Sequence, residues 1–298
     1  MDNLRGSILM VLAMLGFAVE DMLIKQMAGG MPVGQVLILL GLGGATIFGT
    51  LAKLKGDVLW SPVIWHPAMI VRNFCEFIGT MGFIAAIALT PISTASAILQ
   101  ATPLVVTLGA AAFLGETVGW RRWMAILIGL AGVLLIIRPG MDGFDAKSLL
   151  AVVGVLGLAG RDLATRRLPA ATSSRQISFY AFVAAMATGC VLLWLGVTGD
   201  RVVMPGPVDS LRLIAGIIIG VLAYYAIVAA TRIGDLSIVA PFRYSRLVFA
   251  LIIGVLAFGE RPDALTLLGA FIIVASGIYT LMREARLRRA SQAPQPTL

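Results

Sequence analysis

The stretch LGFAVED at residues 15–21 recurs 141 residues later as LGLAGRD at residues 156–162. A second pair of related stretches, FLGE at residues 113–116 and AFGE at residues 257–260, is separated by 144 residues. Self-similarity at a nearly constant offset is the signature of an internal repeat. The chain of 298 residues is therefore predicted to consist of two related halves.

Apolar segments fill most of each half. Ten such segments of about 20 residues follow one another, and each is long enough to cross the roughly 30 Å hydrocarbon layer of a bilayer. They lie at residues 6–27, 33–53, 68–89, 93–114, 121–138, 147–167, 175–197, 210–230, 236–258 and 263–282. Since membrane-spanning strands alternate in polarity and are only about 10 residues long, the segments are expected to be helices. The predicted fold class is an all-α integral membrane protein with ten transmembrane helices.

Each half holds five predicted spans, and this odd number makes the second half cross the membrane in the opposite sense. The halves are then two inverted-topology five-helix repeats, related by a pseudo-two-fold axis in the membrane plane. Secondary transporters use this design, with the substrate site between the repeats near the midplane. We expect an N-terminal repeat at residues 1–139, a C-terminal repeat at residues 140–282, and a basic, disordered cytoplasmic tail at residues 283–298.

A Gly-Glu pair follows the fourth span of each repeat, as Gly115-Glu116 and as Gly259-Glu260. Together with the two five-span halves, these pairs resemble the EamA type of the drug/metabolite transporter superfamily, over nearly the whole chain. The sequence further resembles the ten-span amino-acid exporters, including those of aromatic amino acids. The resemblance implies a secondary transporter that exports amino acids across the bacterial inner membrane. At the span ends, both glutamates are expected to cap helices or to shape turns.

Composition argues against several other classes of protein. Only 13% of the residues are charged, against about 25% in soluble domains. The net charge of +8 comes from residues at the ends of apolar segments, so nucleic-acid binding is not expected. A single histidine and the lack of HExxH and Gly-x-Ser-x-Gly motifs argue against an intramembrane enzyme, and the lack of a P-loop argues against ATP-driven transport. No catalytic residue, metal site or cofactor is predicted, and an exporter of drugs or other metabolites is the alternative among carriers.

The distribution of basic residues predicts the orientation in the membrane. Loops on the side of the two termini carry 14 Lys and Arg residues, and loops on the other side carry 6. Cytoplasmic loops of membrane proteins are enriched in Lys and Arg. Both termini are therefore predicted to lie in the cytoplasm, in a monomer whose partners are the lipid bilayer and a small-molecule substrate.

Polar residues inside the predicted spans are functional candidates, because an ionisable group at membrane depth is costly unless it is paired or hydrated. Helical spacing places Asn73 and Glu76 on one face of the third span, and Arg243 and Arg246 on one face of the ninth. Arginine offers a carboxylate two parallel hydrogen bonds, so either arginine is a candidate to hold a substrate carboxylate, with Glu76 for the ammonium group. This mixture of charges favours an amino acid over a pure cation. The candidate substrate-binding residues are Asn73, Glu76, Phe77, Gln100, Tyr224, Tyr225, Arg243, Tyr244 and Arg246.

A second group of charged residues is predicted to serve gating or pairing between the halves, namely Glu20, Asp21, Arg161 and Asp162. Glu20 and Arg161 occupy equivalent positions in the two repeats, and we expect them to form an inter-half ion pair or gate. Asp21 and Asp162 each precede a basic residue by four positions (Lys25 in the first repeat), and this spacing favours a local ion pair. For the tyrosines, packing within an apolar helix is the alternative to substrate contact.

Overall fold

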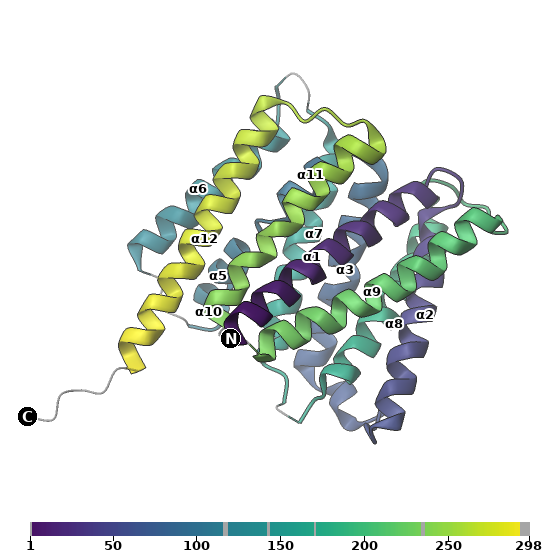
Figure 1. Ribbon diagram of the computed structural model, residues 1–298, viewed down its shortest axis with the longest axis horizontal. Helices are drawn as coiled ribbons and strands as arrows, with labels where there is room; N and C mark the ends of the chain where they lie inside the picture. Colours follow the sequence, from purple (N-terminus) through teal and green to yellow (C-terminus); the bar gives the residue numbers. More distant parts are fainter. Residues whose placement is uncertain (1, 116–118, 142–143, 170, 234–235, 293–298) are drawn as a thin grey trace, which may run out of the picture.

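Helices make up most of the computed structural model, which describes residues 2–115, 119–141, 144–169, 171–233 and 236–292 (Figure 1). The helices are α1 (Asp2–Met27), α2 (Val33–Leu54), α3 (Pro67–Leu89), α4 (Ile92–Leu99), α5 (Thr102–Phe113), α6 (Trp120–Ile137), α7 (Leu149–Thr165), α8 (Ser174–Trp194), α9 (Pro207–Ile233), α10 (Leu236–Val239), α11 (Ser245–Phe258) and α12 (Ala264–Gln292). Three short 3-10 turns accompany them, η1 (Pro62–Trp65), η2 (Ala146–Ser148) and η3 (Ala240–Tyr244). Ten helical segments in the described part of the chain are long and apolar enough to cross a membrane. The predicted all-helical, ten-span fold is confirmed.

The C-terminal tail requires a correction. α12 continues to Gln292, well past the predicted end of the tenth span at residue 282. The segment MREARLRRA at residues 282–290 consists mostly of strong helix formers, so the helix continues beyond its apolar part. Residues 283–292 are therefore helical rather than disordered, and the tail residues that follow lie outside the described part of the chain.

The helices pair in the pattern that a two-fold relation between the repeats requires. α1 packs along α9, and α3 packs along α7. In the repeat, α1 is equivalent to α7 and α3 is equivalent to α9, so these two pairs are copies of each other. α2 packs on α8 and α6 packs on α12, and exchanging each helix for its equivalent in the other repeat converts each of these pairs into itself. In Figure 1, α6 and α12 lie at one edge of the bundle and α2, α8 and α9 at the other, with α1, α3, α7 and α11 between them. The fold thus contains two inverted five-helix repeats.

Small residues let the paired helices approach closely. An added Cβ at Gly157 would collide with the backbone of Gly79, where α7 crosses α3. Gly16 lies against Ala223 in the same way, where α1 crosses α9. The repeat offsets of 141 and 144 residues relate these two contacts, so they are two copies of one packing arrangement. The surrounding lipid is as apolar as the helix side chains, so the hydrophobic effect does not drive membrane helices together. Close van der Waals packing at small residues holds them together instead.

Two glutamines make a second set of symmetry-related contacts, one at each end of the α2–α8 pair. The Gln35 side chain donates to the Val203 carbonyl at 2.6 Å and accepts from the Val203 amide at 2.9 Å. Its equivalent, Gln176, donates to the Val58 carbonyl at 2.8 Å. Each glutamine therefore ties a helix of one repeat to a loop of the other repeat.

The loop that contains Val58 is also held by an ion pair between Asp57 of this loop and Arg175 at the start of α8. Arg175 Nε donates to Asp57 Oδ2 at 2.6 Å, and the Ser173 hydroxyl donates to the same oxygen at 2.9 Å. The hydrogen bond from Arg175 lowers the pKa of the Asp57 carboxyl below its ordinary value of 3.8. A carboxyl whose pKa is lowered by folding stabilises the fold above its unfolded pKa, so this contribution is lost only as the pH falls below 3.8.

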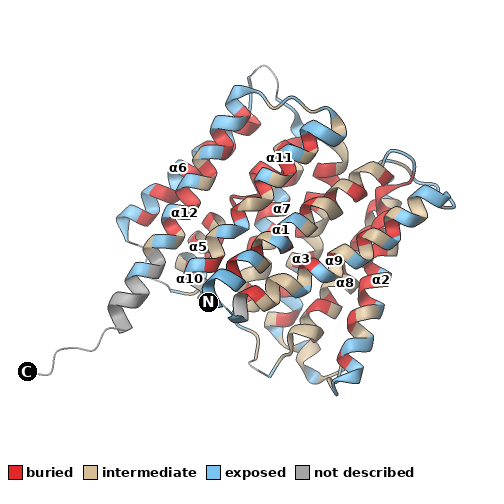
Figure 2. Ribbon diagram, viewed as in Figure 1, coloured by how far each residue is buried: buried red, intermediate tan, exposed pale blue. Residues whose placement is uncertain are grey.

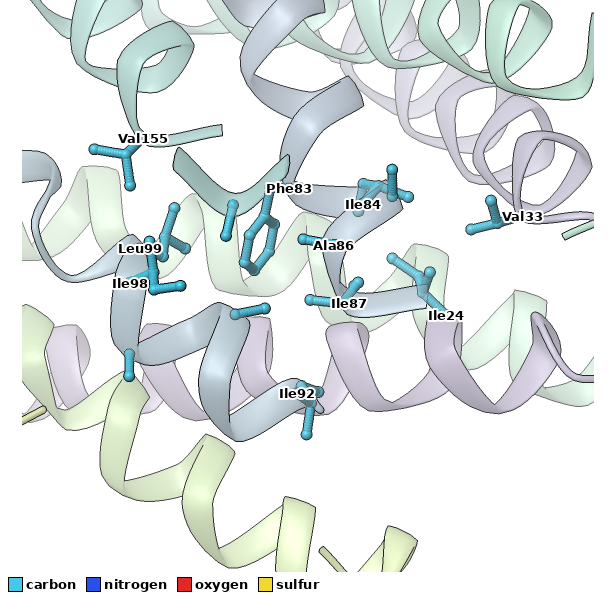
Figure 3. Packing of buried hydrophobic residues seen from close by; sticks show 14 of the residues in the cluster. Ile24, Val33, Phe83, Ile84, Ala86, Ile87, Ile92, Ile98, Leu99 and Val155 are labelled. Carbon is cyan, nitrogen blue, oxygen red and sulfur yellow. The ribbon is translucent and has the colours of Figure 1, made fainter. Parts of the chain in front are cut away.

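Buried residues lie on the helix faces that meet inside the bundle (Figure 2). Around Phe83 of α3, the fully buried Ile87, Ile92 and Ile98 belong to the main apolar cluster (Figure 3). The outward faces carry large exposed apolar side chains instead, such as Leu256. Soluble monomers rarely expose apolar side chains over such an area, so this is the surface of a protein surrounded by lipid.

Candidate functional site

The fourth and ninth spans are both interrupted inside the bundle. α4 ends at Leu99 and α5 begins at Thr102, and in the ninth span the turn η3 precedes α11. Pro103 explains the first interruption, because it has no N–H to donate to the Leu99 carbonyl. The Thr102 hydroxyl donates to that carbonyl at 2.6 Å in its place. Pro241 stands inside η3 and has the same effect on the ninth span.

Gln100 connects the two interruptions. Its side-chain amide donates to the Arg243 carbonyl at 3.4 Å. Gln100 and Tyr244 are equivalent residues, 144 positions apart, so the interruptions are related by the pseudo-two-fold axis. In secondary transporters, discontinuous helices of this kind form the substrate and ion sites.

A network of ion pairs links α3 to α7, and we call it the α3–α7 network. Glu76 lies at its centre, and its two oxygens accept hydrogen bonds from Arg72 and from Arg161, each at 3.1 Å. Arg161 also contacts Asp162, with Nη2 at 2.8 Å from Oδ1. Arg72 donates to Asn73 at 2.9 Å. The Arg72 side chain is only 3% exposed, whereas the Asp162 side chain is 29% exposed, so the network is shielded on α3 and accessible on α7.

A separate ion pair joins α1 to α11. Arg246 Nη2 donates to Asp21 Oδ2 at 2.6 Å, and the Asp21 side chain is 5% exposed. The guanidinium also faces the rings of Phe17 and Phe83, with their centroids 5.4 and 5.3 Å from its central carbon. Contacts between a cation and aromatic faces add to the ion pair. Arg246 is therefore held by the protein itself, which argues against its predicted role as the residue that receives a substrate carboxylate.

Glu20 and Arg243 differ from these paired residues. Within the described part of the chain, neither side chain forms a hydrogen bond or an ion pair. Glu20 precedes Asp21 on α1 and lies against Gly220 of α9, and Arg243 lies in η3, three residues before Arg246. The Glu20 side chain is partly accessible and the Arg243 side chain is exposed. Glu20 and Arg243 thus flank the Asp21–Arg246 pair, and neither has an ion pair of its own among the described residues.

The predicted ion pair between Glu20 and Arg161 is wrong, and the repeat explains why. Glu20 is the equivalent of Arg161, and Gly220 is the equivalent of Glu76. Arg161 therefore meets a carboxylate where α7 crosses α3, but Glu20 meets a glycine where α1 crosses α9. The two copies of one contact therefore differ: one contains an ion pair, and the other contains a glutamate against a glycine.

At the end of the bundle away from the termini, Glu260 caps α4. Its carboxylate accepts from the Ile92 amide at 2.6 Å, and from the amide and hydroxyl of Ser93 at 3.0 and 2.6 Å. Lys25 of α1 approaches the same carboxylate at 3.3 Å. The predicted capping role of Glu260 is confirmed, and the cap crosses from one repeat to the other. We call this contact the latch; Glu116, the equivalent of Glu260, lies outside the described residues.

The latch also corrects the predicted pairing of Asp21 with Lys25. Lys25 reaches toward the end of α1, where it contacts Glu260 and the Thr90 carbonyl. Asp21 lies on the buried face of α1 and meets Arg246. Spacing of four residues favours a pair only where no closer partner is provided by another helix.

The tyrosines separate into inward-facing and lipid-facing residues. Tyr224 packs edge-on against Phe48 with ring centroids 5.7 Å apart, and Tyr244 is buried with no partner for its hydroxyl among the described residues. Tyr225 is 69% exposed and continues the outward stripe of α9 that includes Leu222. Neighbouring helical residues point about 100° apart, so Tyr225 can face outward while Tyr224 packs inward. This outward position favours packing, the alternative to the predicted substrate contact of Tyr225.

Arg72 is the main residue of this region that sequence reasoning missed. The count of basic loop residues includes Arg72, yet its side chain is buried beside Glu76. Its spacing of four residues from Glu76 is the signal that predicts the pair. Phe77, the next residue on α3, is half-buried, and its carbonyl accepts from the Thr188 hydroxyl of α8 at 3.2 Å.

Comparison with known proteins gives a family for both halves of the chain. The model of the EamA-like transporter family matches residues 4–138 and again residues 146–282. The pseudopaline exporter CntI of Pseudomonas aeruginosa is 28% identical, over 93% of this chain and 96% of its own. A riboflavin transporter of Vibrio cholerae is 31% identical, over 76% of this chain and 74% of its own.

Other relatives carry different substrates, and one solved structure supports the fold. An S-adenosylmethionine uptake transporter of Rickettsia bellii is 27% identical over 73% of both chains. A crystal structure of another protein superposes with a TM-score of 0.58 at 18% sequence identity, and covers 96% of this chain and 98% of that one. Such a distant structural match concerns the fold alone. These relatives are transporters and not enzymes. The chain belongs to the EamA-like transporter family of the drug/metabolite transporter superfamily, and it is a multi-pass membrane transporter of small metabolites.

Proposed function

We propose that this protein exports amino acids, aromatic and other neutral ones among them, across the bacterial inner membrane by alternating access between its two repeats. The observation that carries the proposal is the placement of Glu20 and Arg243 beside the interrupted spans, with no hydrogen bond or ion pair to either side chain among the described residues. An unpaired charge at membrane depth is costly, and a zwitterion supplies an ammonium group for one and a carboxylate for the other.

The proposed roles differ from those that the sequence suggests. Arg243 keeps the substrate carboxylate, but Glu20 replaces Glu76 as the partner of the ammonium group. Glu76 is buried, and two guanidinium groups already neutralise its charge. The lining residues in this proposal are Asn73, Phe77, Gln100, Tyr224 and Tyr244.

The relatives support the transport of metabolites and leave two candidates for the substrate. S-adenosylmethionine contains an α-ammonium and an α-carboxylate group, which match Glu20 and Arg243 of the proposed site. Riboflavin has neither group, and its carrier favours the alternative that this protein moves other small metabolites. The exporter that aligns over most of the chain supports the outward direction. We further propose a monomer with both termini in the cytoplasm, divided into repeats at residues 1–139 and 140–282.

Analogues that lack one charge test the two proposed contacts. In proteoliposomes, phenylalanine flux is expected to fall about 10- to 100-fold in Glu20→Gln and in Arg243→Gln, because a hydrogen bond to a charged group contributes about 1.5–3 kcal/mol. The inhibition pattern is more specific. Phenylpropionate lacks the ammonium group, so Glu20→Gln is expected to bind it as well as phenylalanine. Phenethylamine lacks the carboxylate, so Arg243→Gln is expected to lose the preference for phenylalanine over it.

Tyr225→Phe is the matched control, because this side chain faces lipid and its flux is expected to match wild type. Flux of an organic cation or of riboflavin without flux of any amino acid would contradict the proposal and favour the alternative. Unchanged preferences in both charge variants would remove the two residues from the site.

A further inference from the structure

A groove runs along the outside of the bundle between α6 and α12, at the end where the termini lie. It has a volume of about 500 Å³. Its walls are almost entirely apolar, and their largest side chains are Trp120, Met124 and Ile128 of α6 and Phe271 and Tyr279 of α12. All five side chains are exposed. The groove is separate from the charged residues of the proposed substrate site, which lie on other helices.

The lining residues recur at every third or fourth position of both helices, so the groove follows the helix axes. From Trp120 to Ile128 it descends about 12 Å, at 1.5 Å per residue. One leaflet of the hydrocarbon layer is about 15 Å thick. The groove therefore extends from the membrane surface through most of one leaflet, as one acyl chain does.

One charged residue lines this apolar groove, at its surface end. Arg121 is exposed, and its guanidinium lies 5.4 Å from the ring centroid of Trp120. Among the described residues Arg121 forms no ion pair, and no acidic residue lines the groove. We propose that the groove binds an anionic glycerophospholipid, with one acyl chain between α6 and α12 and the phosphate group on Arg121. The aromatic ring beneath the guanidinium holds the arginine at the level of the lipid headgroups.

The charge at the mouth favours a lipid over a second copy of this chain. In a symmetric dimer the same surface of both copies meets, so two Arg121 side chains would approach each other across the contact. An anionic headgroup neutralises this arginine instead, and its acyl chain fills the apolar part.

Competition between two lipids tests the proposal. Full-length protein in detergent is incubated with equal amounts of phosphatidylglycerol and phosphatidylcholine, and the retained lipid is measured by native mass spectrometry. We expect wild type to prefer phosphatidylglycerol about fivefold, the contribution of one basic residue at a membrane surface. Arg121→Gln is expected to abolish the preference. Ala275→Trp, a change at an exposed lining position, fills the groove and is expected to lower retention of both lipids.

Arg5→Gln removes an exposed arginine of α1 at the same end of the bundle, and it is expected to retain the wild-type preference. Thermal unfolding of each variant checks that it is folded. Equal retention of the two lipids by wild type, or an unchanged preference in Arg121→Gln, would overturn the proposal. A disulfide between two copies of Ala275→Cys, made without the native cysteines, would also overturn it, because a second copy then occupies the groove.

Discussion

Replacing Glu76 with alanine is expected to destabilise the protein by about 3–5 kcal/mol, the usual cost of removing one member of a buried ion pair. Its carboxylate accepts from Arg72 and Arg161, each at 3.1 Å. Without it, the buried Arg72 guanidinium keeps Asn73 as its one hydrogen-bond partner among the described residues. The thermal unfolding midpoint of the purified protein in lipid nanodiscs is expected to fall strongly.

A double variant shows whether the loss of stability comes from leaving the Arg72 charge buried without its partner or from losing the contact itself. Replacing a buried ion pair by apolar residues of similar size is often close to neutral. Arg72→Met combined with Glu76→Met is therefore expected to recover most of the stability that either single change loses. Leu222→Ala, a change on the lipid-facing stripe of α9, is expected to have little effect. Simple addition of the two single losses would contradict the structural role of Glu76. A stable double variant with no amino-acid flux would restore Glu76 to the substrate site.

The membrane fold is predictable from sequence because its determinants are local or periodic. The length of an apolar segment decides whether it spans the bilayer, and the internal repeat decides how the two halves are related. Both signals survive in the chain, and the paired contacts of Gly16 and Gly157 show the repeat at the level of single residues. The tail was misjudged because an apolar window ends at residue 282, while helix formers continue α12 to Gln292.

The sequence identifies the polar residues inside the spans, because their residue types stand out in apolar segments. It does not identify their partners. Spacing along one helix suggests Lys25 for Asp21, whereas the fold brings Arg246 from the ninth span. Equivalence in the repeat suggests that Glu20 meets Arg161, but equivalent residues of inverted repeats need not touch each other. Such pairings depend on which faces of distant helices meet, and neither spacing along one helix nor repeat equivalence reveals those faces.

Breaking the latch at Glu260 is expected to open the end of the bundle that lies away from the termini. Three hydrogen bonds from Ile92 and Ser93 end on this carboxylate, and Lys25 pairs with it. Hydrogen bonds to charged groups contribute about 1.5–3 kcal/mol each. Glu260 belongs to the second repeat and its partners to the first, so its loss frees the two repeats from each other at this end.

Accessibility of Ser96 reports this opening. Ser96 lies on α4, one turn from Ile92, and its side chain is buried without a hydrogen-bond partner among the described residues. In a variant with Ser96→Cys and both native cysteines replaced by alanine, Glu260→Gln is expected to raise the rate of labelling by a membrane-impermeant maleimide at least tenfold. A tenfold change requires only about 1.4 kcal/mol, less than the contacts that the latch loses.

Two further variants show whether faster labelling comes from opening of the latch or from local loosening of α4. Lys25→Met removes the ion pair but leaves the cap, so its labelling rate is expected to lie between wild type and Glu260→Gln. Glu116 is the equivalent of Glu260 in the other repeat, and Glu116→Gln is expected to act in the opposite sense and to protect the same cysteine. Faster labelling in both glutamate variants would indicate general loosening of the bundle. Opposite responses require a protein in which closing one end accompanies opening of the other, as alternating access between inverted repeats demands.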